Sequence, residues 1–252
     1  MNALAVFAHP DDETMMCGGT LALLFKEGWN VHFVCATRGE GGEAGDPPVC
    51  SLEELGHVRE GELVCAVGAL GGSSLTFMGY VDPRASVDDR LFPFDANLDL
   101  FSEQIAALIQ QVQASLVISH GSNGEYGHPA HLLTHRGVAN AVASFASQSP
   151  LFYTVHAAYP THPRPRLANA DDPADLVLDV SLVKVRKMNA VCCHRTQHTV
   201  FIRNTSRELG HEVSLADVLL LEESLHRVNP PVQNGEPVSD LLVDSLGKYR
   251  KN

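Results

Sequence analysis

Two short segments of the chain concentrate imidazole and carboxylate side chains. The first, Ala8-His-Pro-Asp-Asp-Glu13, places one histidine and three acids side by side around a proline. Adjacent carboxylates repel one another unless a cation or solvent relieves the charge, and a neighbouring imidazole completes a mixed nitrogen and oxygen ligand set for a metal ion. By itself the segment is equally typical of an exposed acidic turn that caps the helix after it.

The second segment, Ser119 to His131, changes this balance. It carries His120, His128 and His131, and Pro129 suits the first turn of a helix on which the last two imidazoles point toward one place. Four of the 13 histidines therefore lie in the two segments. A lone histidine is usually a structural residue, but this clustering favours a metal site over coincidence.

The elements that must position these residues follow from the hydrophobic pattern. Short apolar runs typical of buried strands alternate with segments of helical periodicity. We expect strands at Leu4–Ala8, Val31–Ala36, Leu75–Met78 and Leu116–Ser119, and helices around Gly18-Gly19, after the Ser51-x-x-Glu54 capping box, over Phe101–Val112 and from Pro129.

This alternation predicts an α/β fold with a Rossmann-like, doubly wound, mainly parallel sheet and helices on both faces, because parallel strands need crossover connections. Both histidine segments follow a predicted strand. They should therefore meet at the carboxyl edge of one sheet, where such folds bind ligands.

The chain is expected to form one domain, residues 1–252, although the pattern weakens after residue 150. Pro160–Asp175 is rich in Pro, Ala and Asp and predicts a surface loop, and Val177–Val180 predicts a strand. Two further helices are expected at 182–193 and 215–227, the second of them after a Ser214-x-x-Asp217 capping box.

Composition limits the kinds of partner. Thirty acidic and eighteen basic side chains give a formal net charge of -12, which argues against nucleic acid because a polyphosphate would be repelled. The N-terminal apolar run lacks a preceding basic region and is too short for a signal peptide or a span, so no membrane association is expected.

The six cysteines form no C-x-x-C pair, and a chain of 252 residues needs no disulfide bonds to stabilise its core. We therefore expect free cysteines and a reducing, cytoplasmic location. The alternative is that Cys17 or the Cys192-Cys193 pair acts as a nucleophile or ligand, but burial as a small apolar side chain is the commoner use of a free cysteine.

In combination, the two histidine segments resemble the PIG-L/LmbE family of zinc-dependent N-deacetylases, which act mainly on N-acetylglucosamine-containing compounds. The likeness rests on Ala8-His-Pro-Asp-Asp-Glu13 and Tyr126-Gly-His-Pro-Ala-His131, and it extends through Thr37-Arg-Gly-Glu40, Val58-Arg-Glu60, Gly79-Tyr-Val-Asp82 and Lys187-x-x-Ala190-x-x-x-His194-x-x-Gln197. The paired His-Pro motifs are specific together, whereas the other patches are weak one by one.

The resemblance implies that His9, Asp12 and His131 ligate a zinc ion. It also implies that Asp11 is the general base and that His128 helps to stabilise the oxyanion. The leaving amine would take its proton from Asp11 or from a cationic His128. Two histidines and one carboxylate also suit Fe(II), so the ligand set alone does not identify the metal.

For the sugar, the resemblance implies hydroxyl or tail contacts from Arg38, Arg59 and Asp82, with Tyr126 and Gln197 lining the pocket. Two of these residues have a structural alternative. Arg59 could pair with Glu62 on its own helix, and Asp82-Pro83 could simply start a turn.

One residue departs from the family pattern, whose second motif usually reads His-Pro-Asp-His. Ala130 stands where that carboxylate could orient a neighbouring imidazole and favour its charged form, which weakens the role implied for His128. The ligand set is unaffected.

The implied reaction removes the acetyl group from an N-acetylglucosamine-type conjugate and releases acetate and a free amine. Its partner is thus a small amino-sugar conjugate, and the family's tendency to self-associate points to a homo-oligomer. Two alternatives stay open: an amidase that cleaves a larger acyl group, and a non-catalytic carbohydrate-binding relative.

Overall fold

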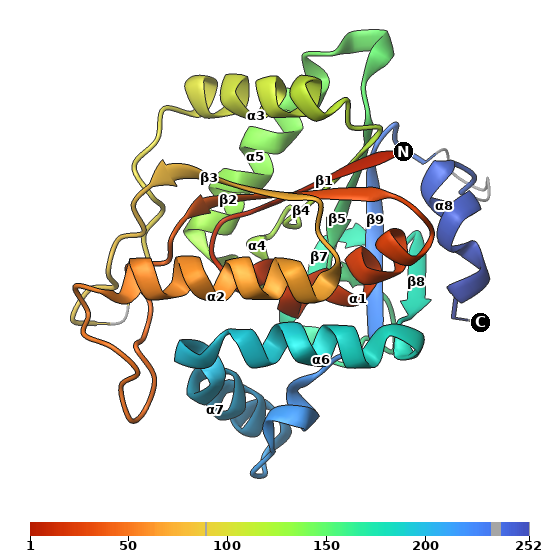
Figure 1. The fold of residues 1–252 in the computed structure, drawn as a ribbon. Coiled ribbons are helices and arrows are strands. Elements are labelled where there is room, and N and C mark those ends of the chain that lie inside the picture. Colours follow the sequence, from red (N-terminus) through yellow and green to blue (C-terminus); the bar gives the residue numbers. More distant parts are fainter. Residues whose placement is uncertain (89, 233–237, 252) are drawn as a thin grey trace.

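The structure is a computed structural model that describes residues 1–88, 90–232 and 238–251. Its main sheet has seven strands in the order β3-β2-β1-β4-β5-β9-β8 (Figure 1). The strands are β1 (Asn2–Phe7), β2 (Asn30–Thr37), β3 (Ser74–Tyr80), β4 (Leu116–Ser119), β5 (Leu151–Val155), β8 (Leu176–Asp179) and β9 (Glu222–Asn229). Neighbours from β3 to β5 are parallel, and β9 runs antiparallel to both β5 and β8. The prediction of a mainly parallel α/β sheet is confirmed.

The longer helices connect these strands and lie on both faces of the sheet (Figure 1). They are α1 (Asp12–Lys26), α2 (Leu55–Leu70), α3 (Leu98–Val112), α5 (Pro129–Ala143), α6 (Lys184–Cys193), α7 (His198–Leu209) and α8 (Leu241–Leu246), with a single turn, α4 (Gly124–Gly127), before α5. A small second sheet pairs β6 (Ala157–Ala158) with β7 (Asn169–Pro173).

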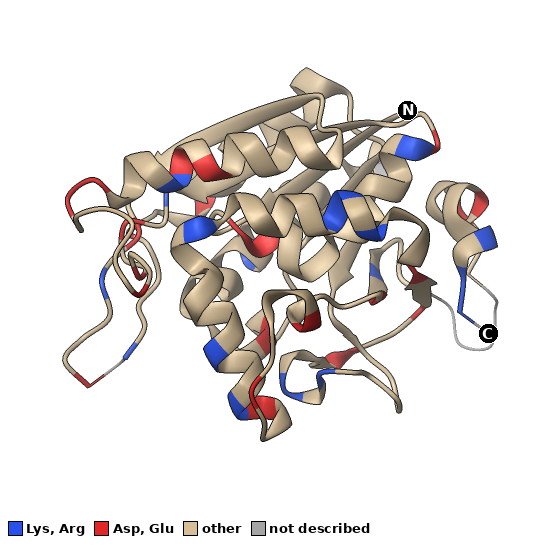
Figure 2. Cartoon of the chain, turned by 60° about the horizontal axis from the view of Figure 1, so that its bottom comes forward, with Lys and Arg blue, Asp and Glu red and all other residues tan. Residues whose placement is uncertain are grey.

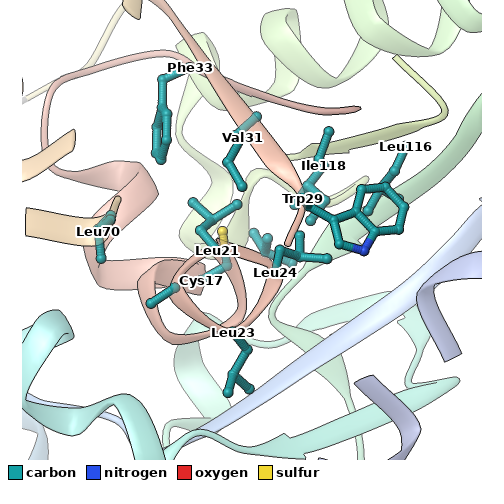
Figure 3. Close-up of a cluster of buried hydrophobic side chains, with 14 of the residues drawn as sticks. Cys17, Leu21, Leu23, Leu24, Trp29, Val31, Phe33, Leu70, Leu116 and Ile118 are labelled. Atoms are coloured by element: carbon teal, nitrogen blue, oxygen red, sulfur yellow. The ribbon is translucent and has the colours of Figure 1, made fainter. Parts of the chain in front are cut away.

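Two hydrophobic clusters fasten the helices to the sheet, because successive side chains of a strand point to opposite faces. Ala3, Ala5 and Phe7 of β1 belong to a cluster with residues of α1, α2, α6 and α8, part of which Figure 3 shows around Cys17, Leu21 and Trp29. Leu4 and Val6 belong to the cluster on the other face, with residues of α3 and α5. β1 is therefore buried on both sides, which explains its continuous apolar run.

The strand order reverses beside β1, since β2 follows it on one side and β4 flanks it on the other. In open α/β sheets this reversal leaves a crevice at the carboxyl ends of the two central strands, where ligands bind. His9 follows β1 and His120 follows β4. The fold thus brings both histidine segments to this crevice, as the sequence predicted.

The helix expected over residues 215–227 is wrong. The Ser214-x-x-Asp217 capping box forms, but it starts only a 3-10 turn, Leu215–Val218, and the chain then enters β9. β9 fills the place between β5 and β8, so its backbone groups are paired on both sides. That pairing outweighs the local helical signal.

The surface loop expected over Pro160–Asp175 is also wrong in part, because β7 occupies Asn169–Pro173 and its Asn169 and Asp172 are buried. Their side chains take hydrogen bonds from the segment after β4: Asp172 Oδ2 accepts from Ser122 N, and Asn169 Oδ1 accepts from Glu125 N. This part of the chain therefore supports the second histidine segment.

The expectation that all cysteines are free is contradicted by a disulfide bond between Cys65 of α2 and Cys193 of α6. These two helices pack against each other and bring the Cα atoms to 5.7 Å, although the cysteines are 128 residues apart in sequence. Cys17, Cys35, Cys50 and Cys192 are free. The cytoplasmic location loses the support of cysteine usage and stays a prediction.

Within the described ranges, no helix combines the length and the apolar character needed to cross a membrane. A single domain over residues 1–252 and self-association stay predictions.

Candidate metal centre and active site

His9 and Asp12 occupy the turn from β1 into α1. Asp12 lies in the first turn of α1, where the unpaired backbone N–H groups of the helix favour a carboxylate. Its Oδ2 accepts a hydrogen bond from His9 N at 2.9 Å and lies 3.3 Å from the Nδ1 of the same histidine. Both side chains are nearly inaccessible to solvent. The turn therefore fixes the carboxylate against the imidazole.

Glu125 orients the imidazoles of the second segment. Its Oε2 accepts hydrogen bonds from Nδ1 of His120 at 3.1 Å and from Nδ1 of His131 at 2.6 Å. A carboxylate only accepts, so both rings carry their proton on Nδ1 and direct the lone pair of Nε2 elsewhere. Burial alone would raise the pKa of Glu125, but the two histidines outweigh it and hold this pKa well below its usual range.

The free Nε2 atom of His131 points at the first segment, 3.4 Å from Asp12 Oδ1. Nε2 of His9 and Nε2 of His131 are buried, and neither forms a hydrogen bond to any described residue. His120 differs, because its Nε2 accepts the backbone N–H of Ala8 at 3.0 Å. Nε2 of His9 and Nε2 of His131 are therefore left without a hydrogen bond among the described residues, although His9 Nε2 lies 3.3 Å from Asp82 Oδ1, whereas Nε2 of His120 is occupied.

These residues fit a single divalent cation. His131 belongs to two sets of possible ligands whose donor atoms all lie within 4.8 Å of one another, one with His9 and His128 and one with Asp12 and His120. Donors around a tetrahedral zinc with bonds of about 2.1 Å lie about 3.4 Å apart, which matches the 3.4 Å between Asp12 Oδ1 and His131 Nε2. Burial lowers the pKa of the His9 imidazole. The carboxylates of Asp12 and Asp82 together have the larger effect and raise this pKa to about 9. The excess negative charge that attracts a proton here would equally favour a metal cation.

Asp11 lies beside this cluster in a strained conformation. It is the N-cap of α1 with φ 105°, in the left-handed region, which costs an ordinary residue about 1 to 3 kcal/mol. Its Oδ2 accepts a hydrogen bond from Arg59 Nη2 at 3.2 Å, and the same nitrogen donates to Pro10 O at 2.6 Å. Burial raises the pKa of Asp11 to about 6, and the Arg59 guanidinium opposes the rise.

Glu13 binds the backbone of Asp11, and His194 contacts Glu13. Glu13 Oε2 accepts the backbone N–H of Asp11 at 3.0 Å, and Glu13 Oε1 lies 3.2 Å from His194 Nε2. Glu13 and His194 are both buried. The sequence analysis assigned no role to Glu13, His194 or Glu125. All three nevertheless lie inside the segments that it singled out.

A cavity of about 800 Å³ opens onto the cluster. This volume is in the range of small-molecule sites. Its inner wall includes His9, Asp11 and Asp12 from the first segment and Glu125, Tyr126 and His128 from the second. Asp82 after β3 and Gly41–Glu43 after β2 form another side. Loops at the ends of four parallel strands therefore share one cavity.

Comparison with known proteins decides the family. A model of the family described as PIG-L: GlcNAc-PI de-N-acetylase matches residues 4–142, more than half of the chain. The chain belongs to the PIG-L family. The resemblance inferred from the two His-Pro segments is thus confirmed, and with it the deacetylase class of hydrolase.

Two curated PIG-L relatives match along most of their length. The 1D-myo-inositol 2-acetamido-2-deoxy-alpha-D-glucopyranoside deacetylase of Rhodococcus opacus (strain B4) is 30% identical over 262 residues, with 87% of this chain and 89% of the relative covered. A probable N-acetyl-alpha-D-glucosaminyl L-malate deacetylase 2 of Bacillus cereus is 31% identical over 214 residues, with 84% of this chain and 90% of the relative covered.

Among solved structures, GalB of Pseudomonas putida KT2440, a 4-carboxy-2-hydroxymuconate hydratase, superposes with a TM-score of 0.65 at 22% identity. The alignment covers 93% of this chain and 99% of that chain. This similarity confirms the fold that PIG-L proteins share.

The departure at Ala130 from the usual PIG-L motif changes the surroundings of His128. His128 caps α5, and its Nδ1 accepts the backbone N–H of Ala130 at 3.2 Å. Burial lowers the pKa of His128 to about 3, and the nearby His131 and His9 add to the effect. The ring is therefore neutral and offers one donor, Nε2–H, so the cationic His128 considered from the sequence is not favoured.

The five residues predicted to contact the sugar divide into two groups. Arg59, Asp82, Tyr126 and Gln197 line the cavity, whereas Arg38 is not among its lining residues in the described part of the chain. Arg38 is half exposed and pairs with Glu40 at 3.1 Å.

Of the four residues that line the cavity, Arg59 and Gln197 also donate hydrogen bonds to backbone carbonyl groups. Arg59 donates to Gly39 O at 2.9 Å, and Gln197 Nε2 donates to Glu43 O at 2.7 Å. The proposed pairing of Arg59 with Glu62 is wrong, because Glu62 accepts from Thr196 N and Oγ1 instead. Sugar contacts from these residues stay predictions.

His156 adds a titratable group to the cavity wall, and it predicts a pH-dependent stability. Burial lowers its pKa to about 3, although Glu125 favours the charged form, and His162 lies 3.3 Å away. Below pH 6.5 the unfolded chain therefore binds a proton that the folded protein does not, so stability falls as the pH drops from about 6.5 toward 3.

We expect this one group to remove about 2 kcal/mol of unfolding free energy between pH 7 and pH 5. His156→Asn should flatten that part of the profile, because Asn does not titrate and tolerates the positive φ of 51° at this position. Urea unfolding of both proteins at the two pH values measures the difference. Equal pH slopes would show that His156 is not held neutral.

Proposed function

We propose that the chain is a zinc-dependent N-deacetylase that hydrolyses the acetamide of an N-acetylglucosamine conjugate to acetate and a free amine. One observation carries the proposal: Nε2 of His9 and Nε2 of His131 are buried without hydrogen-bond partners among the described residues, and each faces a carboxylate, Asp82 Oδ1 at 3.3 Å from His9 and Asp12 Oδ1 at 3.4 Å from His131. A structural cluster would have satisfied those nitrogens, because an unpaired buried polar atom is destabilising.

His9, Asp12 and His131 would hold the metal ion, with Glu125 fixing the tautomer of His131. When bound, the ion supplies a Lewis acid for a water molecule and for the acetyl oxygen. Zinc suits three ligands of this kind, and the resemblance of the two His-Pro segments to zinc-dependent N-deacetylases favours it over Fe(II).

Asp11 is proposed as the proton carrier. It takes a proton from the attacking water as the water oxygen bonds to the acetyl carbon, and it then delivers the proton to nitrogen as the C–N bond breaks. A pKa of about 6 suits both steps near neutral pH. Arg59 holds the carboxylate in place, and the Nε2–H of neutral His128 donates to the developing oxyanion.

Two alternatives were left open by the sequence. A non-catalytic relative would have no use for the strain at Asp11, which the structure maintains through Glu13 and Arg59. An amidase for a larger acyl group would differ only in the acyl side of the cavity, so dependence of turnover on acyl-chain length separates it from a deacetylase.

The test is turnover of a panel of N-acetylglucosamine conjugates by the purified protein, with released amine measured. The inositol and malate conjugates belong in the panel, because the curated relatives are deacetylases of those compounds. We expect turnover of at least one conjugate, loss of activity after treatment with a chelator, and recovery on adding zinc. Activity that survives complete removal of metal, or no released amine from any conjugate, would contradict the proposal.

A further inference from the structure

Groups of both charges line the cavity. Asp11, Asp12 and Asp82 line it at the metal centre, together with Arg59. Three further arginines, Arg164, Arg166 and Arg207, and one acid, Glu208, also belong to its wall. This concentration of positive charge is unusual in a chain whose net charge is -12.

Only one of the three arginines is neutralised. Arg164 is buried, and its Nη1 lies 3.1 Å from Glu208 Oε2. Within the residues that the structure describes, Arg166 and Arg207 take part in no salt bridge, and both are exposed on the cavity side of the molecule. The cavity wall therefore includes two arginines that no carboxylate of the described residues neutralises.

The two unpaired arginines come from elements that contact each other. Arg166 lies on the short 3-10 turn Pro165–Leu167, and Arg207 lies near the end of α7. The Arg164–Glu208 contact ties this turn to α7. Figure 2 shows basic positions on α7 and on the loop beside it. The Arg164–Glu208 contact therefore keeps the two elements that carry Arg166 and Arg207 together.

Apolar side chains line the same cavity. They are Leu167, Val200, Phe201, Val218 and Leu220, the first three of which come from the same turn and helix as the two arginines. Such walls lower the local dielectric and strengthen an ion pair formed against them. Guanidinium groups match the planar, two-oxygen geometry of a carboxylate and also bind phosphate. A neutral polyol would leave both positive charges without a counterpart.

From this we infer that the group attached to the amino sugar is anionic, and that Arg166 and Arg207 bind its carboxylate or phosphate. The inference rests on the proposed function, because it assumes that the acetamide of the same molecule lies at the metal centre. It selects among the conjugates in the panel: an acidic aglycone such as malate is favoured over a neutral one such as inositol.

Steady-state kinetics on three substrates test it: the malate conjugate, N-acetylglucosamine 1-phosphate and the neutral inositol conjugate. For the wild type we expect a lower KM for at least one anionic substrate than for the neutral one. Arg166→Gln and Arg207→Gln should each raise that KM about tenfold with kcat little changed, and leave the neutral substrate unaffected. Arg207→Lys should retain part of the effect, because it keeps the charge.

The matched control is Arg136→Gln, which removes one exposed positive charge from α5 outside the cavity and should change neither KM. The anionic substrate that binds better identifies the carboxylate or the phosphate as the ligand. Equal KM values for charged and neutral substrates, or equal shifts for both in the arginine variants, would overturn the inference and leave the deacetylase proposal standing.

Calorimetric binding of the same three compounds separates the two proposals. If no compound is hydrolysed but the anionic one still binds more tightly, and loses this advantage in the Arg166→Gln/Arg207→Gln double variant, the deacetylase proposal fails and the anion site is supported. Equal affinities for all three compounds would overturn the anion site whatever the turnover.

Discussion

Asp11→Asn is expected to lower kcat about a thousandfold while the protein still binds one metal ion, because a positioned general base contributes two to four orders of magnitude. Asn keeps the size of the side chain and is among the few residues that tolerate the left-handed backbone at position 11. It can still accept the hydrogen bond from Arg59 but cannot take a proton from water. Turnover and metal content of the same sample measure the two effects.

The matched control for this prediction is Asp95→Asn, which removes an exposed carboxylate that does not line the cavity and should leave kcat unchanged. Loss of metal from Asp11→Asn would mean that Asp11 is a ligand and that Asp12 takes the part of the base. A kcat close to that of the wild type would remove Asp11 from the mechanism altogether.

Most of the first half of the fold followed from local sequence because β1, β2 and β4 are buried on both faces. The strands predicted at Leu4–Ala8, Val31–Ala36 and Leu116–Ser119 agree with β1, β2 and β4 to within a residue or two at either end. Parallel pairing with helical crossovers then left one place for the two histidine segments to meet. Their convergence could therefore be predicted without knowing any distance.

The second half did not follow, because its strands depend on partners far away in sequence. β9 forms only through pairing with β5 and β8, and nothing in the local pattern of residues 219–229 signals that position in the sheet. The Cys65–Cys193 bond depends in the same way on the packing of α2 against α6. Contacts of this kind are properties of the assembled fold.

The candidate site shows the same division. Ligand types could be predicted from His9, Asp12 and His131, since their chemistry is visible in sequence. Glu125 could not be assigned, because its role depends on a positive φ of 58° that turns the carboxylate back onto His120 and His131. The two unpaired arginines of the cavity wall come from a loop and α7, which no motif connects.

Glu125→Gln is expected to weaken zinc binding by about ten- to a hundredfold, the usual effect of losing a carboxylate that supports a ligating histidine. The carboxylate holds the proton of His131 on Nδ1 through a 2.6 Å hydrogen bond and so leaves Nε2 free for the metal. The amide of Gln has one acceptor oxygen and two N–H donors. An imidazole that faces the N–H groups must accept through Nδ1 and therefore carries its proton on Nε2, where it blocks metal binding. Competition with a chromogenic chelator measures the affinity.

Because Glu125 acts through His131, the loss should be one of metal affinity and not of chemistry. Saturating zinc is expected to restore most of kcat in Glu125→Gln, whereas it cannot do so in Asp11→Asn. Glu103→Gln, which alters an exposed acid of α3 away from the cavity, is the matched control and should bind zinc as the wild type does. Unchanged zinc affinity in Glu125→Gln would show that His131 needs no such support, and it would remove the strongest reason for counting this imidazole among the ligands.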